Sequence, residues 1–248
     1  LVYNIWVIKA FIHKFSSSKS FVKITAQMYP YLLFIGITTL MIGWIWGVLY
    51  APEDFQQGNS YRIIFLHVPA SIFAQTIYYF MSICALMHIV WRVKLAAYLI
   101  KSAAPIGAMI TFIALFSGSI WGIPTWGTWW QWDARITSTL ILFIMYLGIL
   151  TLHGSFSNLE KADRLMSILV IVGVVNLPII KKSVDWWSTL HQPASISTSG
   201  SSIDPSMLMP LLISIVGLGF TLISLGILSS RLYILNREKN KKWVLEHV

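Results

Sequence analysis

The sequence predicts an all-α integral membrane protein, a six transmembrane helix bundle with a tryptophan-rich loop on its outer face. Its composition points this way, because 56% of the 248 residues are hydrophobic and only 11% are charged, whereas a soluble domain carries about 25% charged residues. The chain also contains six uncharged stretches that are apolar throughout rather than at alternate positions. Continuous apolar runs favour helices over the strands of a membrane barrel.

The membrane-spanning helices are predicted from the length of these stretches. About 20 helical residues are needed to cross the ~30 Å hydrocarbon layer. The fourth and fifth stretches have only 17 and 16 residues, so we expect them to use flanking residues as well. The spans are predicted at about 31–50, 68–91, 102–121, 136–152, 165–180 and 207–230, in a membrane domain of residues 31–230 between a cytoplasmic N-terminal segment 1–30 and a basic cytoplasmic tail 231–248.

The distribution of lysine and arginine predicts the orientation. Most of the 18 basic residues fall in the two termini and in the loops after the second and fourth spans, and such loops lie on the cytoplasmic side. Both termini are therefore predicted inside, and the tryptophan-rich loop outside. We expect a bacterial inner membrane, although a mitochondrial inner membrane would give the same pattern. The other loops hold only Arg62, Arg135, Lys181 and Lys182.

Three local features complete the outline. Residues 1–30 lack the cleavage site of a secretory signal, and Ile5–Phe15 is predicted to form an interfacial helix. The stretch SISTSGSS at 195–202 is predicted to be a flexible outer loop. The single cysteine, Cys84, excludes an intrachain disulfide and a CxxCH motif, so the chain is not itself a c-type cytochrome.

The tryptophan-rich loop is the most unusual part of the sequence. Residues 126–137 read WGTWWQWDARIT, and five of the chain's 12 tryptophans lie between 121 and 132. Tryptophan is enriched at membrane interfaces as an anchor, but such anchors are scattered over many helix ends. A dense cluster indicates a surface that binds something flat and apolar. Its members are Trp121, Trp126, Trp129, Trp130 and Trp132.

Two histidines are predicted on the same outer face. His67 stands just before the second span, and His191 lies in the loop before the sixth. One imidazole from each side of an aromatic loop can ligate a single metal from opposite faces, which suits the iron of a flat tetrapyrrole packed against indoles. Zinc fits less well, because no cluster of ligands has the required spacing. His13, His88 and His153 lie on the inner side and are expected to be structural, and His247 is expected to be solvated.

The charged residues of the loop allow two readings. Tetrapyrrole propionates need cations, and Arg135, Arg62, Lys181 and Lys182 are the outer-side candidates. Asp133 would then brace the loop. Alternatively, Asp133 is only the cap of the fourth span and Arg135 extends towards lipid headgroups. The sequence leaves both readings open.

Three motifs in order then resemble one known family. WGTWWQWDARIT is similar to the signature W-G-x-W-W-x-W-D-x-R-[L]-T of the WWD-motif membrane proteins that handle haem in cytochrome c maturation, with Ile136 where leucine is usual. YRIIFLHVPAS and SVDWWSTLHQP resemble the flanking segments that carry this family's two outer-face histidines. The resemblance extends over all six spans. Larger members have more spans and further histidines, so this chain resembles the short members.

The resemblance implies a function. The chain would bind haem b as transported cargo at the periplasmic or intermembrane face, through His67, His191 and the tryptophan loop. It would deliver the haem to the membrane-anchored haem chaperone CcmE, beside the ATP-binding-cassette subunits CcmA and CcmB and the small membrane subunit CcmD. The chain has no G-x-x-x-x-G-K-[ST] phosphate loop, so an ATP-driven step would belong to partners. Whether the chain moves haem across the bilayer or only presents it, and whether it catalyses attachment to the chaperone, stays open.

Two functions of other classes are alternatives. A transporter of another amphipathic ligand, such as a quinone, would carry ionisable residues at mid-depth in its spans, where this chain has essentially only His88. A structural subunit could instead bind partners through the tryptophan loop, since tryptophan is also common at protein interfaces. The absorption spectrum of the purified protein would distinguish these functions from haem binding.

Overall fold

A computed structural model describes residues 17–187, 189–191, 195–197 and 200–246. Over these residues the protein is a bundle of long helices, and six helical segments are long and apolar enough to cross a membrane. The predicted fold class is therefore confirmed. The predicted interfacial helix at 5–15 lies outside the described residues.

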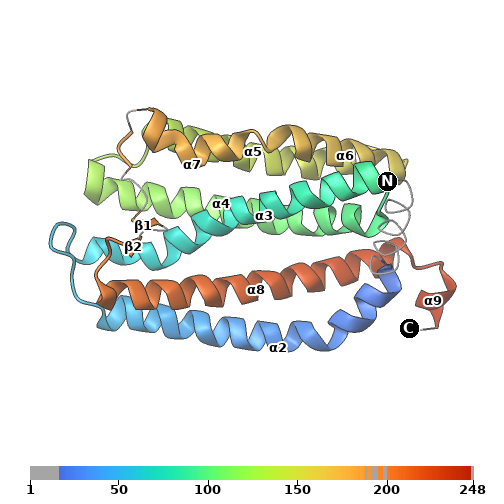
Figure 1. Cartoon of the computed structure of the whole chain (residues 1–248), viewed down its shortest axis with the longest axis horizontal. Helices are drawn as coiled ribbons and strands as arrows, with labels where there is room; N and C mark the ends of the chain where they lie inside the picture. The colour runs from blue at the N-terminus through green and yellow to red at the C-terminus, as the bar shows by residue number, and fades with distance from the viewer. Residues whose placement is uncertain (1–16, 188, 192–194, 198–199, 247–248) are drawn as a thin grey trace, which may run out of the picture.

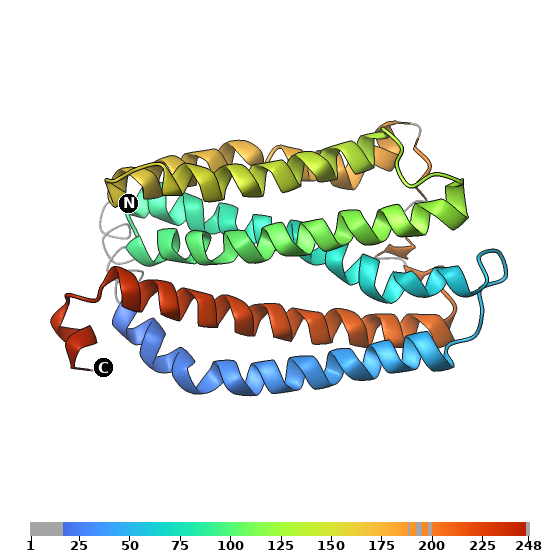
Figure 2. The ribbon, with the colours of Figure 1, turned by 180° about the vertical axis from the view of Figure 1, so that it is seen from behind.

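The bundle has three layers of helices (Figure 1). One edge is formed by α2 and α8, the middle by α3 and α4, and the other edge by α5 together with α6 and α7, as the reverse view also shows (Figure 2). The helices are α2 (Ser18–Ile45), the π-helical turn η1 (Trp46–Tyr50), the 3-10 turn η2 (Asn59–Ile63), α3 (Ile64–Trp91), α4 (Lys94–Trp126), α5 (Ala134–Gly154), α6 (Leu159–Gly173), α7 (Asn176–Trp186), α8 (Pro205–Arg237) and α9 (Lys242–Leu245).

The helices extend beyond the apolar stretches that predicted them. The first span was placed after Pro30, but α2 begins at Ser18, with the Ser17 side chain accepting a hydrogen bond from the Ser20 amide. Pro30 lies inside α2, which bends in its N-terminal part (Figure 1). Proline removes one backbone hydrogen bond, which permits a bend without ending the helix. Hydropathy detects only the apolar turns, so the polar first turns of α2 fall in the predicted N-terminal segment although they are helical.

The fifth span is made of two helices, α6 and α7, which together cover 28 residues. They meet beside Gly173, where an added Cβ would overlap the hydroxyl group of Tyr78. The helical segment thus extends past the 16-residue apolar run on both sides, in agreement with the expectation that it uses flanking residues. Lys181, Lys182 and Trp186 belong to the exposed outer turns of α7 rather than to the third outer loop, because the polar end of this helix carries no hydropathy signal.

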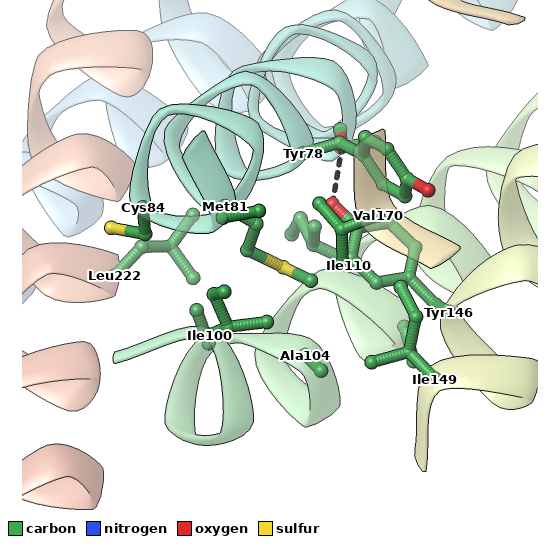
Figure 3. Close-up of a cluster of buried hydrophobic side chains, with 14 of the residues drawn as sticks. Tyr78, Met81, Cys84, Ile100, Ala104, Ile110, Tyr146, Ile149, Val170 and Leu222 are labelled. Carbon is green, nitrogen blue, oxygen red and sulfur yellow. Dashed lines mark hydrogen bonds between the residues drawn. The ribbon is translucent and has the colours of Figure 1, made fainter. Parts of the chain in front are cut away.

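The bundle core consists of large side chains from α3, α4, α5 and α6 (Figure 3). Tyr78 and Tyr146 are fully buried and meet edge to face with ring centroids 5.3 Å apart. The Tyr146 hydroxyl also donates a hydrogen bond to the Ala74 carbonyl oxygen, at 2.9 Å. This packing fixes α3, α4 and α5 relative to one another, and these helices carry the candidate site at their ends.

Three connections gather at one end of the bundle (Figures 1 and 2). They are residues 51–58, residues 127–133 and the segment between α7 and α8, which contains a small antiparallel hairpin of β1 (Ile196–Ser197) and β2 (Gly200–Ser201). The segment predicted to be a flexible loop at 195–202 therefore holds a two-stranded hairpin. The first turn of α2 and the helix α9 lie at the opposite end.

Candidate functional site

His67 lies in the first turn of α3, with its ring directed at α4. Its Nδ1 atom is 3.0 Å from the Ala114 carbonyl oxygen and 3.1 Å from the Ser117 hydroxyl. A carbonyl oxygen can only accept, so Nδ1 carries the proton in this arrangement. The lone pair is then on Nε2, whose neighbour is the Ser71 hydroxyl at 3.4 Å. The protein thus holds His67 in the tautomer that can ligate a metal through Nε2.

Two further contacts fix the His67 ring. An added Cβ at Gly118 would lie 2.8 Å from the imidazole Cε1 atom, so only glycine lets α4 approach this closely. Trp121 contacts the ring edge to face at a centroid distance of 5.6 Å. Its indole Nε1 donates to the Gln57 side-chain oxygen at 2.8 Å. Sequence reasoning missed Ser117, Gly118 and Gln57, because small or neutral residues give no chemical signal until the fold brings them to the ring.

His191 is oriented by a carboxylate. Its Nδ1 is 2.8 Å from one oxygen of Asp133, and the Asp133 side chain is 5% exposed. The other carboxylate oxygen accepts from the Ile136 amide at 2.8 Å, which caps α5. One side chain thus caps α5 and also holds the His191 ring. The Trp126 ring contacts the His191 ring edge to face at 4.7 Å.

The electrostatic setting of His191 favours its neutral form. Burial lowers the pKa of the imidazole, and the charge of Arg135 acts in the same direction, while the hydrogen bond and the charge of Asp133 oppose them. The balance is a pKa below the usual histidine value. A neutral ring that donates from Nδ1 to Asp133 has its lone pair on Nε2, which is the form that binds metals.

The two imidazoles lie at the same end of the bundle (Figure 1). They are close enough for the charge of His191 to act on His67, and Arg135 acts on both. Among the residues that the structure describes, no group of three or more His, Cys, Asp or Glu side chains could hold a bare metal ion. Iron in a porphyrin has four ring nitrogens of its own and needs only axial ligands. The donor set therefore fits haem better than a free ion.

The tryptophan cluster divides into two groups. Trp121 and Trp126 belong to α4, which extends to a left-handed cap at Gly127 with φ of 75°, so the predicted loop is shorter than its tryptophans suggested. These two indoles contact the histidines. Trp129 and Trp132 are 65% and 74% exposed, and Trp130 packs against both. An exposed aromatic surface thus adjoins a pair of anchored imidazoles.

The candidate cations are used in different ways. Arg62 donates from Nη2 to the Ala51 carbonyl at 2.9 Å, from Nη1 to two carbonyls of η1, and from Nε to the Asn59 side chain. It thereby stabilises the C-terminal end of the first helical segment. Among the described residues, Arg135 donates one hydrogen bond, from Nε to the Ser183 hydroxyl at 3.3 Å. Lys182 pairs with Asp185 at 2.9 Å.

Comparison with known proteins identifies the family of this chain. Residues 11–245 match the family model described as CcmC, heme exporter protein C. The chain belongs to the CcmC family.

CcmC-family relatives come from bacteria and from a plant organelle. A heme exporter protein C of Escherichia coli K12 is 46% identical over 235 residues, which is 95% of each chain. One from Bradyrhizobium diazoefficiens is 46% identical over 218 residues, or 88% of this chain and 82% of the relative. A Marchantia polymorpha protein described as a cytochrome c biosynthesis ccmC-like mitochondrial protein is 42% identical over 206 residues, or 79% of this chain and 88% of the relative. With six candidate spans, this CcmC-family chain is a multi-pass membrane protein.

Proposed function

We propose that the protein binds haem at the outer face of the membrane through His67 and His191, and delivers it to the haem chaperone CcmE during cytochrome c maturation. One observation carries the binding step. Each imidazole is held at Nδ1 by an acceptor, at 3.0 Å for His67 and 2.8 Å for His191, which leaves Nε2 for a metal. Membership of a family described as haem exporters supports the choice of haem.

The neighbours of the two histidines act as positioning residues. Ala114, Ser117 and Gly118 set the place of the His67 ring. Asp133 accepts the Nδ1 proton of His191, and such a carboxylate fixes the ring and makes Nε2 a better donor to iron. His67 in α3 and His191 in the connection between α7 and α8 can thus act as a pair of ligands whose rings are already oriented before haem binds.

The remaining residues provide an apolar surface and charge. We assign porphyrin contact to Trp129, Trp130 and Trp132, of which the first and last are largely exposed, and ring support to Trp121 and Trp126. Arg135 is assigned to a propionate, because its terminal nitrogens have no hydrogen-bond partner in the described part of the chain. Arg62 is assigned a supporting role near the site, because it donates its hydrogen bonds to backbone carbonyls.

Location and partners follow from the charge pattern and the family. Lysine and arginine gather at the two termini and in the loops on the same side, so this side lies in the cytoplasm or matrix. The opposite end, which carries the three connections, faces the periplasm or the intermembrane space. The membrane is the bacterial inner membrane or its mitochondrial counterpart. Haem b is cargo, and an exposed loop suits a ligand that must leave again. CcmA, CcmB and CcmD complete the complex with CcmE.

Absorption spectra of histidine variants test the proposal. The unaltered protein should show six-coordinate haem. His67→Ala and His191→Ala should each lose one axial ligand and bind haem more weakly. His88→Ala is the control, since this ring bonds to Ser167 at 2.8 Å in another part of the bundle and should leave the spectrum unchanged. Six-coordinate spectra of normal intensity in both test variants would refute the ligand assignment. Transfer from loaded protein to purified CcmE tests delivery separately.

A further inference from the structure

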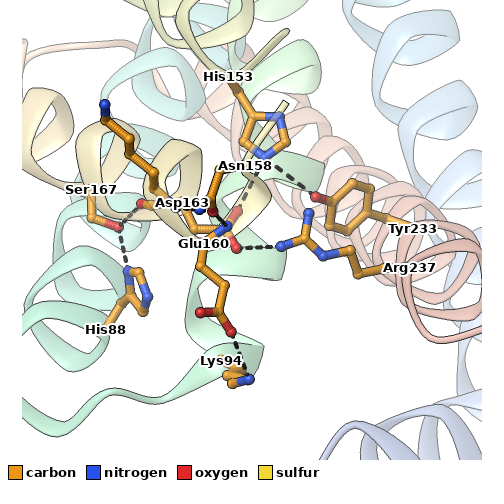
Figure 4. A network of polar contacts seen from close by, with 10 residues as sticks. His88, Lys94, His153, Asn158, Glu160, Asp163, Ser167, Tyr233 and Arg237 are labelled. Carbon is orange, nitrogen blue, oxygen red and sulfur yellow. Dashed lines mark hydrogen bonds and ion pairs between the residues drawn. The ribbon is translucent and has the colours of Figure 1, made fainter. Parts of the chain in front are cut away.

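A second polar cluster lies at the opposite end of the bundle, between α5, α6 and α8 (Figure 4). Asp163 is its centre, and its carboxylate accepts from Arg237 Nη2 at 2.8 Å and contacts His153 Nε2 at 3.1 Å. The Tyr233 hydroxyl lies 3.4 Å from the same imidazole nitrogen. The haem-binding proposal uses none of these four residues.

Arg237 has an unused donor in this cluster. Its side chain is 12% exposed, and within the described part of the chain its buried Nη1 has no hydrogen-bond partner. The Tyr98 ring lies 5.7 Å from the guanidinium carbon, and Nη1 still has no acceptor among the described residues. Buried charged donors are nearly always hydrogen-bonded. The orphaned Nη1 therefore points to an acceptor outside the described residues.

A cavity adjoins the unused donor. It has a volume of about 350 Å³ and is lined by His153, Leu159, Tyr233, Asn236, Arg237 and Lys239. The nearby carboxylates are already paired: Asp163 with Arg237, Glu160 with Lys94, and Glu238 with Lys241. The lining contains no carboxylate. Arg237 is already paired with Asp163, so the positive charge that favours an anion comes from Lys239, which has no ion pair among the described residues, and Arg237 adds a free N–H donor.

The cavity walls and position narrow the class of anion. Leu159 and the ring of Tyr233 give the lining an apolar side. The cavity lies at the end of the bundle where most lysines and arginines gather, which is the depth of lipid headgroups. A water molecule could satisfy Nη1, but it would not use the charge of Lys239 or the apolar wall.

We propose that this cavity binds the phosphate of an anionic phospholipid, with Arg237 Nη1 donating to a phosphate oxygen and Lys239 facing the negative charge. Leu159 and Tyr233 contact the glycerol and the first part of the acyl chain. The site would tie α5, α6 and α8 to the inner leaflet. It does not depend on haem binding at the other end of the protein.

Lipid titrations of the purified full chain in neutral detergent test the site. Bound lipid is counted by native mass spectrometry, and the thermal midpoint is followed with phosphatidylglycerol, with phosphatidylcholine of the same acyl chains, or with inorganic phosphate. Phosphatidylglycerol should be retained and should raise the midpoint. Lys239→Gln should weaken its binding roughly fivefold, the effect of one basic residue near an anionic surface. Arg237→Lys keeps a cation for Asp163, removes Nη1, and should weaken binding as well.

Lys242→Gln is the matched control, because this lysine is in the same tail, outside the cavity lining, with its side chain 92% exposed. It should bind phosphatidylglycerol normally. An equal loss in Lys242→Gln and Lys239→Gln would show diffuse attraction and overturn the site. Equal retention of both lipids would do the same. Full stabilisation by inorganic phosphate alone would overturn the lipid proposal and show that the cavity binds a free anion. If Arg237→Lys does not fold, the comparison of phosphatidylglycerol binding by Lys239→Gln and Lys242→Gln still tests the proposed site.

Discussion

Replacing Asp133 by asparagine changes one carboxylate oxygen to an NH₂ group where the α5 cap and His191 meet. One oxygen now accepts from the Ile136 amide and the other from His191 Nδ1, both at 2.8 Å. Asparagine has a single oxygen. Because it caps helices as well as aspartate, its oxygen should stay with Ile136, and its NH₂ then faces Nδ1. The imidazole must accept there, so its proton moves to Nε2 and blocks the metal-binding atom.

The expected size of this effect follows from the loss of an outer partner of a metal ligand. Such losses reduce metal affinity about 10- to 100-fold, or about 1.4 to 2.8 kcal/mol. The upper part of this range is expected, since the Asp133 side chain is 5% exposed and the His191 side chain 19%, so water replaces the lost acceptor poorly. Thermal stability should change little, because the helix cap is retained.

Haem titration of the apoprotein, followed in the Soret band, measures this prediction. Asp204→Asn is the control, because Asp204 also caps a helix, accepting from the Ser206 amide at 2.9 Å, but is exposed and is not recorded in contact with a histidine. It should leave haem affinity unchanged. If Asp133→Asn binds haem with unaltered affinity and axial spectrum, then the carboxylate does not set the tautomer of His191.

Three other substitutions separate binding from stability. Gly118→Ala places a Cβ 2.8 Å from the His67 ring and should weaken haem binding severalfold in a titration, whereas Gly226→Ala, with nothing within 4 Å, should not. Tyr146→Phe removes a buried 2.9 Å hydrogen bond to α3 and should cost about 1 kcal/mol of stability, seen as a lower thermal midpoint with a normal haem spectrum. Trp132→Ala, at a side chain 74% exposed, should weaken haem binding while stability changes by less than about 0.5 kcal/mol; normal haem affinity would contradict its assigned contact.

The sequence by itself determined the fold class, the number of spans and the residue types of the candidate site. A bilayer requires every backbone group of a spanning segment to be bonded within the protein, which helices and closed barrels achieve. Barrel strands alternate between apolar and polar residues, so long runs that are apolar throughout indicate helices here. The tryptophan cluster and the two histidines were visible because their chemistry is unusual in any context. The polar ends of the helices were not, which is why α2 and α7 extend past the predicted limits.

Only the tertiary structure decided which residues serve one another. Asp133 and His191 are 58 positions apart, and their pairing depends on how the start of α5 and the connection between α7 and α8 meet. Arg62 looked as suitable for a propionate as Arg135, yet the fold turns it to the carbonyls of the first span. His153 was expected to be structural, and the structure adds beside it a cavity and an unpaired Arg237 donor. The sequence shows which chemical groups are present. Which of these groups contact one another depends on which helix ends the packing brings together.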